Sequence, residues 1–303
     1  MPNLKVKLGR LELQNPVMPA SGTFGYGEEY APLINLNLLG AIVTKGISLT
    51  PQEGNPPPRI QETRGGIVNS IGLQNVGFEV FVKEKLPFLR KLRIPIIVNF
   101  FGNTVNEYVK VAEKISTIEG VAALEVNLSC PNIKAGGIYF GSTPRSVAKI
   151  TKILVKSTKF PLIVKLSSQV SNIKGICSAA EEEGAEAVTL INSIPAIVID
   201  LDRRKSALGG VIGGLSGPAI KPIALKTVWE VASTVKIPII GVGGIMDYSD
   251  ALEFLVAGAT AVQVGTANFI NPWSMPKIIK GIDSFLKQEG IEDIREIIGS
   301  FEL

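Results

Sequence analysis

The stretch Val121-Ala-Ala-Leu-Glu-Val-Asn-Leu128 sets a pattern that recurs along this chain. It is a short and nearly continuous apolar run, which is typical of a strand in a parallel sheet with both faces covered. Polar residues follow it at once, in Ser129-Cys-Pro-Asn132. We therefore expect a buried strand here, with polar groups just beyond its carboxyl end.

Seven further runs of this kind occur, and segments with helical periodicity fill the gaps between runs. The predicted strands cover residues 16–20, 41–45, 95–100, 122–127, 162–166, 187–191, 237–242 and 261–264. Eight strand–helix units in 303 residues predict an α/β protein with a (β/α)8 TIM barrel, formed as a single domain over residues 1–303. A doubly wound sheet is the competing architecture, but no single topological switch point marks it.

Local signals also place helix ends and an additional strand pair. Thr143 before Pro144 is typical of an N-cap and first helical residue, and Asp247 is suited to cap a later helix. Gly184 fits the position just after a helix that begins near residue 173. Residues 4–13 alternate charged and apolar side chains, which predicts a short strand pair ahead of the barrel.

Two connections are much longer than the two to six residues usual between a strand and a helix. They cover residues 46–77 and 192–218, and each follows a predicted strand. Both should therefore extend over the carboxyl-terminal face of the barrel. The second contains Ala196-Ile-Val-Ile-Asp200, where we expect a small extra strand covering the site.

The composition is that of a globular protein, with 46% hydrophobic and 19% charged residues. The net charge of +4 comes from 31 basic and 27 acidic residues that are interspersed, so we expect no nucleic-acid partner. The sequence shows neither a secretory leader nor an apolar run of the roughly 18 residues that a membrane span needs. These observations predict a soluble, cytoplasmic protein with no membrane partner.

The sequence contains no histidine. This excludes the Ser-His-Asp triad, the Cys-His pair and imidazole metal sites, and we expect no metal. Of the two cysteines, Cys177 lies on the apolar face of a predicted helix and should be a core residue. Cys130 lies in a polar loop, where it is a candidate for proton chemistry. Only about 3% of an ordinary thiol is ionised at neutral pH, so a Cys130 base predicts activity that increases toward alkaline pH.

Polar residues gather at the carboxyl ends of the first six predicted strands. They are Ser21, Thr44-Lys45-Gly46, Asn99, Asn127, Lys165 and Asn192-Ser193. In a (β/α)8 barrel such residues line the active site, although single ones are often solvated loop residues. The last two strands end in the glycine turns Gly241-Val-Gly243-Gly244 and Gly265-Thr266. The loops after strands seven and eight commonly hold phosphate, so both turns together predict a phosphorylated ligand.

Five motifs resemble those of the dihydroorotate dehydrogenase family. They are Thr44-Lys-Gly46, Asn69-Ser-Ile-Gly-Leu-Gln-Asn75, Asn127-Leu-Ser-Cys-Pro-Asn132, Gly243-Gly244 and Gly265-Thr266. The continuation Ile133-Lys-Ala-Gly136-Gly137-Ile-Tyr-Phe-Gly141 is similar to that of the type 1B catalytic subunit. Position 130 carries cysteine rather than the serine of the membrane-associated class, and position 193 carries serine where threonine is common.

The resemblance implies an enzyme of pyrimidine biosynthesis that oxidises (S)-dihydroorotate to orotate with FMN. Cys130 is implied as the base that takes the C5 proton, while C6 delivers a hydride to FMN. The implied FMN contacts are Ser21, Lys45, Gly46, Asn99, Asn127, Lys165, Ile191, Gly217, Gly243, Gly244, Gly265 and Thr266. The implied substrate contacts are Lys45, Asn69, Ser70, Ile71, Gly72, Leu73, Asn127, Asn192 and Ser193.

A partner subunit is implied as well. It would carry FAD and a [2Fe-2S] cluster, pass electrons to NAD, and form a heterotetramer of two catalytic and two electron-transfer chains. This chain has no dinucleotide-binding fingerprint, and two cysteines are too few for a cluster. Three alternatives stay open: a type 1A homodimer that reduces fumarate, a related flavin barrel acting on another pyrimidine or on dihydrouridine in RNA, and a non-redox phosphate-binding barrel or silent scaffold.

Overall fold

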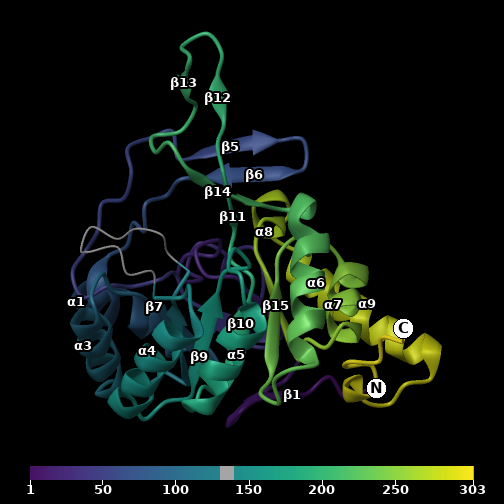
Figure 1. Ribbon diagram of the computed structural model, residues 1–303. Helices are drawn as coiled ribbons and strands as arrows, with labels where there is room; N and C mark the ends of the chain where they lie inside the picture. Colours follow the sequence, from purple (N-terminus) through teal and green to yellow (C-terminus); the bar gives the residue numbers. More distant parts are fainter. Residues whose placement is uncertain (130–139, 303) are drawn as a thin grey trace.

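The computed structural model describes residues 1–129 and 140–302, and it is built around an eight-stranded parallel sheet (Figure 1). In spatial order the strands are β3 (Val17–Pro19), β16 (Ala261–Val264), β15 (Ile239–Val242), β10 (Ala187–Leu190), β9 (Leu162–Leu166), β8 (Ala123–Asn127), β7 (Ile96–Phe100) and β4 (Ile42–Val43). The Gly40 N–H donates to the Val17 carbonyl at 2.8 Å, which links the two ends of this order. Each strand falls inside one of the eight predicted runs, so the (β/α)8 barrel is confirmed.

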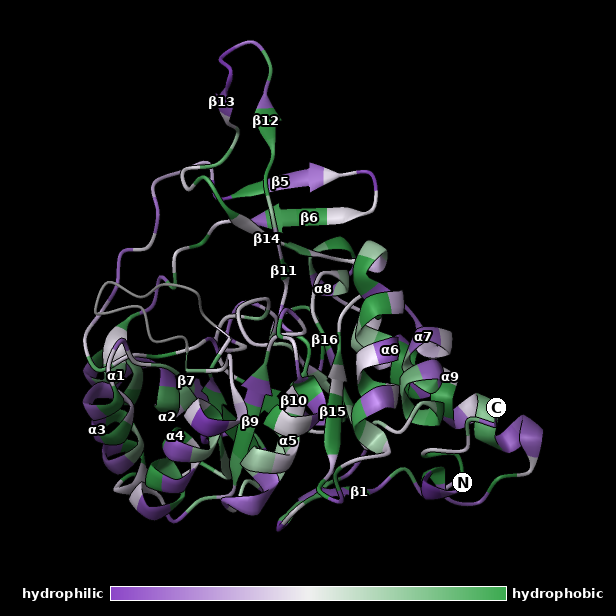
Figure 2. Cartoon of the chain, viewed as in Figure 1, coloured by the Kyte–Doolittle hydropathy of each residue, from purple (hydrophilic) through white to green (hydrophobic). Residues whose placement is uncertain are grey.

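Helices surround the barrel, and their apolar residues face the strands (Figure 2). They are α1 (Gly77–Val80), α2 (Leu86–Leu89), α3 (Val105–Ser116), α4 (Pro144–Ser157), α5 (Ile173–Glu182), α6 (Lys221–Ala232), α7 (Tyr248–Val256), α8 (Ala267–Ile270) and α9 (Ser274–Glu289). The 3-10 turns are η1 (Leu36–Leu38), η3 (Pro218–Ile220) and η4 (Ile294–Glu296), and η2 (Phe81–Lys85) is a π-helical segment between α1 and α2. No helix among the described residues is long and apolar enough to cross a membrane.

The predicted helix ends are confirmed. The Thr143 side chain accepts from the Ser146 N–H, and the Asp247 side chain accepts from two N–H groups in the first turn of α7. Gly184 follows α5 with φ of +92°, a left-handed conformation that favours glycine. Cys177 is fully buried on α5, and burial raises the pKa of its thiol to about 12. Its assignment to the core is therefore correct.

The two long connections join to form a second sheet beyond the carboxyl-terminal end of the barrel (Figure 1). It is antiparallel, and its order is β11 (Ile194–Ala196), β14 (Gly213–Ser216), β6 (Gly66–Asn69) and β5 (Ile60–Thr63). The expectation of one extra strand over residues 196–200 is wrong in detail, because β11 ends at Ala196. The chain continues into the protruding hairpin of β12 (Ile199–Asp200) and β13 (Lys205–Ser206).

The predicted amino-terminal strand pair is present at the opposite end of the barrel (Figure 1). It consists of β1 (Val6–Leu8) and β2 (Leu11–Leu13), paired antiparallel. Val6, Leu8, Leu11 and Leu13 are buried in the main core, while the residues between them face solvent. The hairpin therefore contributes apolar area to the core at the end of the barrel where the strands begin.

Candidate active site

The polar residues predicted at the strand ends lie together. Parallel pairing aligns Asn99 of β7 with Glu125 of β8, and Asn127 of β8 with Lys165 of β9. Ser21 and Lys45 come two residues after β3 and β4, and Asn192-Ser193 follow β10. Because carboxyl ends of parallel strands meet at one edge, these side chains share the carboxyl-terminal face with the second sheet.

A polar cluster inside the barrel joins two of the predicted residues, Asn99 and Lys165, to three that were not predicted, Glu125, Thr189 and Gln263. Its centre is Glu125, which is fully buried. The Glu125 carboxylate accepts from Asn99 Nδ2 at 2.7 Å, from Thr189 Oγ1 at 2.8 Å and from Gln263 Nε2 at 2.6 Å. Lys165 Nζ lies 3.3 Å from Gln263 Oε1 and 3.8 Å from Glu125 Oε1. The signal for this cluster was a glutamate and a glutamine within otherwise apolar predicted strands.

Glycines line the part of the face next to β15 and β16. Gly217, Gly243 and Gly244 have φ of +103°, +132° and +78°, so side chains are disfavoured there. A Cβ at position 243 would lie 2.9 Å from the Ala224 side chain, and one at 244 would lie 2.8 Å from the Lys221 backbone nitrogen. These turns therefore lie against the first turn of α6.

The turn after β16, Gly265-Thr266, completes a glycine cradle with Gly217, Gly243 and Gly244. Thr266 Oγ1 donates to the Oγ of Ser216, the residue before Gly217, at 2.9 Å. A Cβ at position 217 would lie 3.5 Å from the Thr266 side chain. The structure thus brings Gly217, Gly243-Gly244 and Gly265-Thr266 together, although they belong to three separate connections. Backbone N–H groups of glycine turns beside a helix N-terminus suit an anion.

The second sheet carries the predicted residues 69–73. Asn69 ends β6, and its Nδ2 donates to the Gly214 carbonyl of β14 at 3.1 Å. Ser70 is buried and accepts from Asn55 Nδ2 at 2.8 Å. Ile71, Gly72 and Leu73 form a turn in which Gly72 and Leu73 have φ of +72° and +58°. Gly214 lies directly against Ser193, so the two substrate segments predicted from the sequence meet at this sheet.

Lys45 is the predicted cation of the site. Its side chain is partly buried, and Nζ donates to Gln74 Oε1 at 3.4 Å. Desolvation lowers the Lys45 pKa, the positive charge of Arg59 lowers it further, and Glu29 opposes the shift. Next to it, a Cβ at Gly46 would lie 2.7 Å from Asn99 Oδ1, so glycine lets the two segments approach.

The segment that leads to position 130 is held firmly. Tyr108 Oη donates to the Asn127 carbonyl at 2.9 Å, and the Ser129 N–H donates to Asn127 Oδ1 at 3.1 Å. Ser129 Oγ donates to the Lys165 carbonyl at 3.1 Å. Cys130 itself lies outside the described residues. On the neighbouring strand end, the Ile191 N–H donates to the Val242 carbonyl at 2.9 Å, which places Ile191 beside the end of β15.

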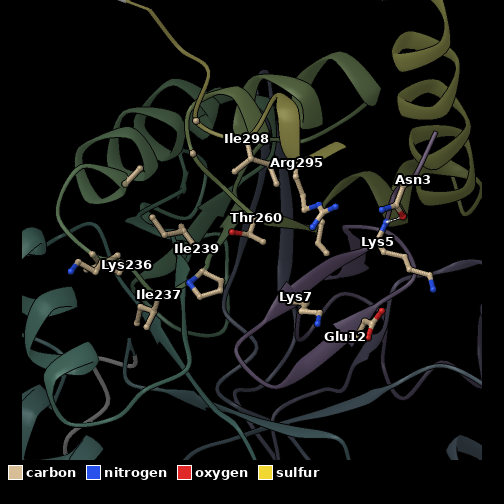
Figure 3. Close-up of a pocket in the computed structure, with 16 residues that line it drawn as sticks. Asn3, Lys5, Lys7, Glu12, Lys236, Ile237, Ile239, Thr260, Arg295 and Ile298 are labelled. Atoms are coloured by element: carbon tan, nitrogen blue, oxygen red, sulfur yellow. Dashed lines mark hydrogen bonds between the residues drawn. The ribbon is translucent and has the colours of Figure 1, made fainter. Parts of the chain in front are cut away.

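A cavity of about 540 Å³ opens at the amino-terminal end of the barrel (Figure 3). It is lined by the β1–β2 hairpin, the starts of β15 and β16, and the segment around η4. Lys5, Lys7, Glu12, Lys236 and Arg295 contribute to its walls, and all five residues are exposed. None of the predicted site residues that the structure describes lines this cavity, and this end of a (β/α)8 barrel usually serves stability.

Fold and site together define a class of protein. It is a (β/α)8-barrel enzyme whose polar side chains and glycine turns share the carboxyl-terminal face, where such enzymes carry their active sites. A sequence model of the family described as dihydroorotate dehydrogenase matches residues 3–286. The chain therefore belongs to the dihydroorotate dehydrogenase family, as the motifs predicted.

Individual relatives are similar over their whole length. A protein of Thermodesulfovibrio yellowstonii named dihydroorotate dehydrogenase B (NAD(+)), catalytic subunit, is 58% identical over 302 residues and covers 100% of both chains. A protein of the same name from Geotalea uraniireducens is 53% identical over 99% of this chain and 98% of its own. One from Geobacter sulfurreducens is 53% identical over 100% of this chain and 99% of its own.

Proposed function

We propose that this chain is the catalytic subunit of an NAD-linked dihydroorotate dehydrogenase that oxidises dihydroorotate to orotate with bound FMN. Family membership and full-length relatives with that name support the reaction. The observation that carries the proposal is the joint placement of two parts on one face. A glycine cradle suited to phosphate lies beside a group of lysine and asparagine side chains suited to a flavin and a pyrimidine.

The residues present fit FMN. Gly217, Gly243 and Gly244 combine positive φ with close packing against Gly66 and the first turn of α6, so these turns present backbone rather than side chains. Gly265-Thr266 lie beside Gly217, and we assign the phosphate to these backbone turns. For the isoalloxazine we assign Asn99, Asn127 and Lys165, together with Ser21, Lys45, Gly46 and Ile191. A buried ammonium such as that of Lys165 favours the electron-rich reduced form of a flavin. When bound, FMN supplies the hydride acceptor for the oxidation.

We assign the substrate contacts by matching the side chains of the site to the charged and polar groups of an anionic pyrimidine. Lys45 can pair with the carboxylate, and a charge-assisted hydrogen bond of this type contributes about 1.5–3 kcal/mol. Asn69, Asn127 and Asn192 can both donate and accept, which matches the alternating N–H and C=O groups of the ring. Ser193 and the turn at 70–73 complete the assigned contacts. Together these residues orient the substrate and exclude water from it.

We assign the base to Cys130, which follows Asn127 by three residues in the sequence. Its thiolate would take the C5 proton of dihydroorotate as the C6 hydrogen leaves with its electron pair. The chain has no histidine, so a thiol is the available group at this place in the motif. Since the thiolate is the reactive form, the rate should rise with pH until the thiol is fully ionised.

The electrons then require a second protein. The relatives are named catalytic subunits of NAD(+)-dependent enzymes, which supports a separate electron-transfer subunit. We assign FAD and a [2Fe-2S] cluster to that subunit, and a heterotetramer of two chains of each kind to the complex.

The test is to purify the chain alone and co-expressed with the electron-transfer subunit. We expect FMN in both preparations, and dihydroorotate-dependent reduction of NAD only in the complex. Rapid turnover of the isolated chain with fumarate would contradict the NAD-linked assignment. A colourless protein that takes up no FMN on reconstitution would contradict the flavin assignment.

A further inference from the structure

The mechanism proposed above leaves one buried acidic group unused. Glu125 lies in the middle of β8 and is fully buried, and its side chain points into the barrel. The interior of a (β/α)8 barrel is usually filled by branched apolar residues. A buried ion pair stabilises a fold little compared with well-packed apolar residues. A carboxylate in this place therefore needs a reason other than stability.

The contacts of Glu125 join strands that lie far apart in the sequence. Oε1 accepts from Asn99 of β7, and Oε2 accepts from Thr189 of β10 and from Gln263 of β16, which is 138 residues away. Each neighbour offers a donor, so the carboxylate acts as an acceptor toward all of them. Asn99, one of the residues assigned to the flavin, is thereby fixed by Glu125.

Lys165 is the charged neighbour of this cluster. Its side chain is 6% exposed, and that of Glu125 is 0% exposed. Among the ion pairs of the described residues, no other has both side chains less than a tenth exposed. An uncompensated buried ammonium is costly, so Glu125 balances the charge that Lys165 brings into the barrel.

We propose that Glu125 is a positioning residue that fixes Asn99 and balances the charge of Lys165, and thereby sets how strongly the site favours a reduced flavin. This inference rests on the proposed function, because it concerns the flavin bound above the cluster. It adds to that function a residue that touches neither substrate nor flavin and acts through two that do.

The first test is the near-isosteric change Glu125→Gln. Removing the negative charge leaves the Lys165 ammonium uncompensated, which favours the electron-rich reduced flavin. We expect reduced FMN to bind at least about tenfold more tightly relative to oxidised FMN than in the wild type. For a two-electron couple this is a rise in midpoint potential of about 30 mV, measured by spectroelectrochemistry of the bound flavin. Loss of packing alone predicts weaker binding of both forms and no such rise.

A second variant returns the charge to the cluster. In the double variant Glu125→Gln/Gln263→Glu, the carboxylate moves to position 263, whose side-chain oxygen already lies 3.3 Å from Lys165 Nζ. We expect the ratio of the affinities for reduced and oxidised FMN to return to within about threefold of the wild-type ratio. The control is Glu186→Gln, which removes a carboxylate paired with Arg10 at 2.6 Å, away from the polar cluster. It should leave the potential unchanged.

A third measurement needs no flavin. In flavin-free protein, Glu125→Gln should lower the free energy of unfolding more in the wild-type background than in the Lys165→Met background. The reason is that Lys165→Met has already removed the positive charge that Glu125 balances. Equal destabilisation in both backgrounds, or a wild-type potential in Glu125→Gln, would overturn the inference. If Glu125→Gln does not fold, the double variant Glu125→Gln/Gln263→Glu decides. A folded double variant with the wild-type midpoint potential supports the inference, and an unfolded double variant overturns it. If the wild-type protein binds no flavin, the proposed function is contradicted. The unfolding measurements on flavin-free protein would still test the pairing of Glu125 with Lys165.

Discussion

At the amino-terminal end of the barrel, the β1–β2 hairpin contributes Val6, Leu8, Leu11 and Leu13 to the core, and the charged residues that line the cavity there are exposed. Toward the carboxyl-terminal end, two charged side chains lie in the interior instead. Lys165 and Glu125 are buried inside the barrel. One end therefore serves stability, whereas the other holds buried polar groups at a cost in stability. Changes at the two ends should therefore have separable consequences.

The largest effect on chemistry is expected from Cys130→Ala. Loss of a general base typically slows a proton-transfer step by about 10²–10⁴-fold, so reduction of the bound flavin by dihydroorotate should slow by that factor. Stopped-flow absorbance measures it directly. The matched control is Cys177→Ala, since Cys177 is a buried thiol on α5 with no place in the site. Equal slowing in both variants would contradict the base assignment.

At the amino-terminal end, Leu8→Ala should act on stability alone. Leu8 is 1% exposed, and removing a fully buried leucine side chain costs about 2–5 kcal/mol. Chemical denaturation measures the loss. The rate of flavin reduction in the folded variant should stay within about twofold of the wild type. A large loss of rate without a loss of stability would break the proposed separation of the two ends.

Substrate affinity should respond to Lys45→Met. Loss of a charge-assisted hydrogen bond of about 1.5–3 kcal/mol should weaken orotate binding roughly 10- to 150-fold. Titration of the flavin spectrum with orotate measures this affinity. Lys7→Met removes the same charge at the other end of the barrel and should leave orotate binding unchanged. Weakening by both variants would indicate a long-range charge effect rather than contact.

The glycine cradle can be tested with Gly244→Ala. Its φ of +78° disfavours a side chain, and the new Cβ would lie 2.8 Å from the Lys221 backbone nitrogen. Strain of about 1–3 kcal/mol should weaken FMN binding roughly 5- to 150-fold. Gly290→Ala has a similar φ of +70° with no atom within 4 Å of the new Cβ, so it separates backbone strain from displacement of the cradle. Unchanged FMN affinity in Gly244→Ala would remove this turn from the phosphate site.

The smallest effect is expected from pH. The Lys45 pKa is lowered, mainly by desolvation, so the ammonium is lost at a lower pH than in an ordinary lysine. Orotate affinity should fall as pH rises through that value, by at most about tenfold per pH unit. The folded state also binds fewer protons than the unfolded state there, so stability of the ligand-free protein should rise with pH. Lys45→Met should abolish both dependences, and a pH dependence that survives in it would contradict this origin.

The sequence was sufficient for the barrel because each strand is a local apolar run and each helix cap a local signal. It was insufficient where partners are distant. The Glu125 cluster joins β7, β8, β9, β10 and β16, and only the closed barrel brings them into contact. The small extra strand expected over residues 196–200 was wrong in detail, because β11 ends at Ala196 and β12 covers only Ile199–Asp200. Ile197 and Ile199 are 60% and 58% exposed, so these apolar side chains lie at a protruding hairpin instead of covering the site.

The proposed oxidation of dihydroorotate by a flavin bound at the carboxyl-terminal face is tested most directly by anaerobic addition of dihydroorotate to the purified chain after reconstitution with FMN. We predict loss of the oxidised-flavin absorbance, with one orotate formed per flavin reduced. Retention of the oxidised spectrum at saturating dihydroorotate, with no orotate formed, would contradict the account.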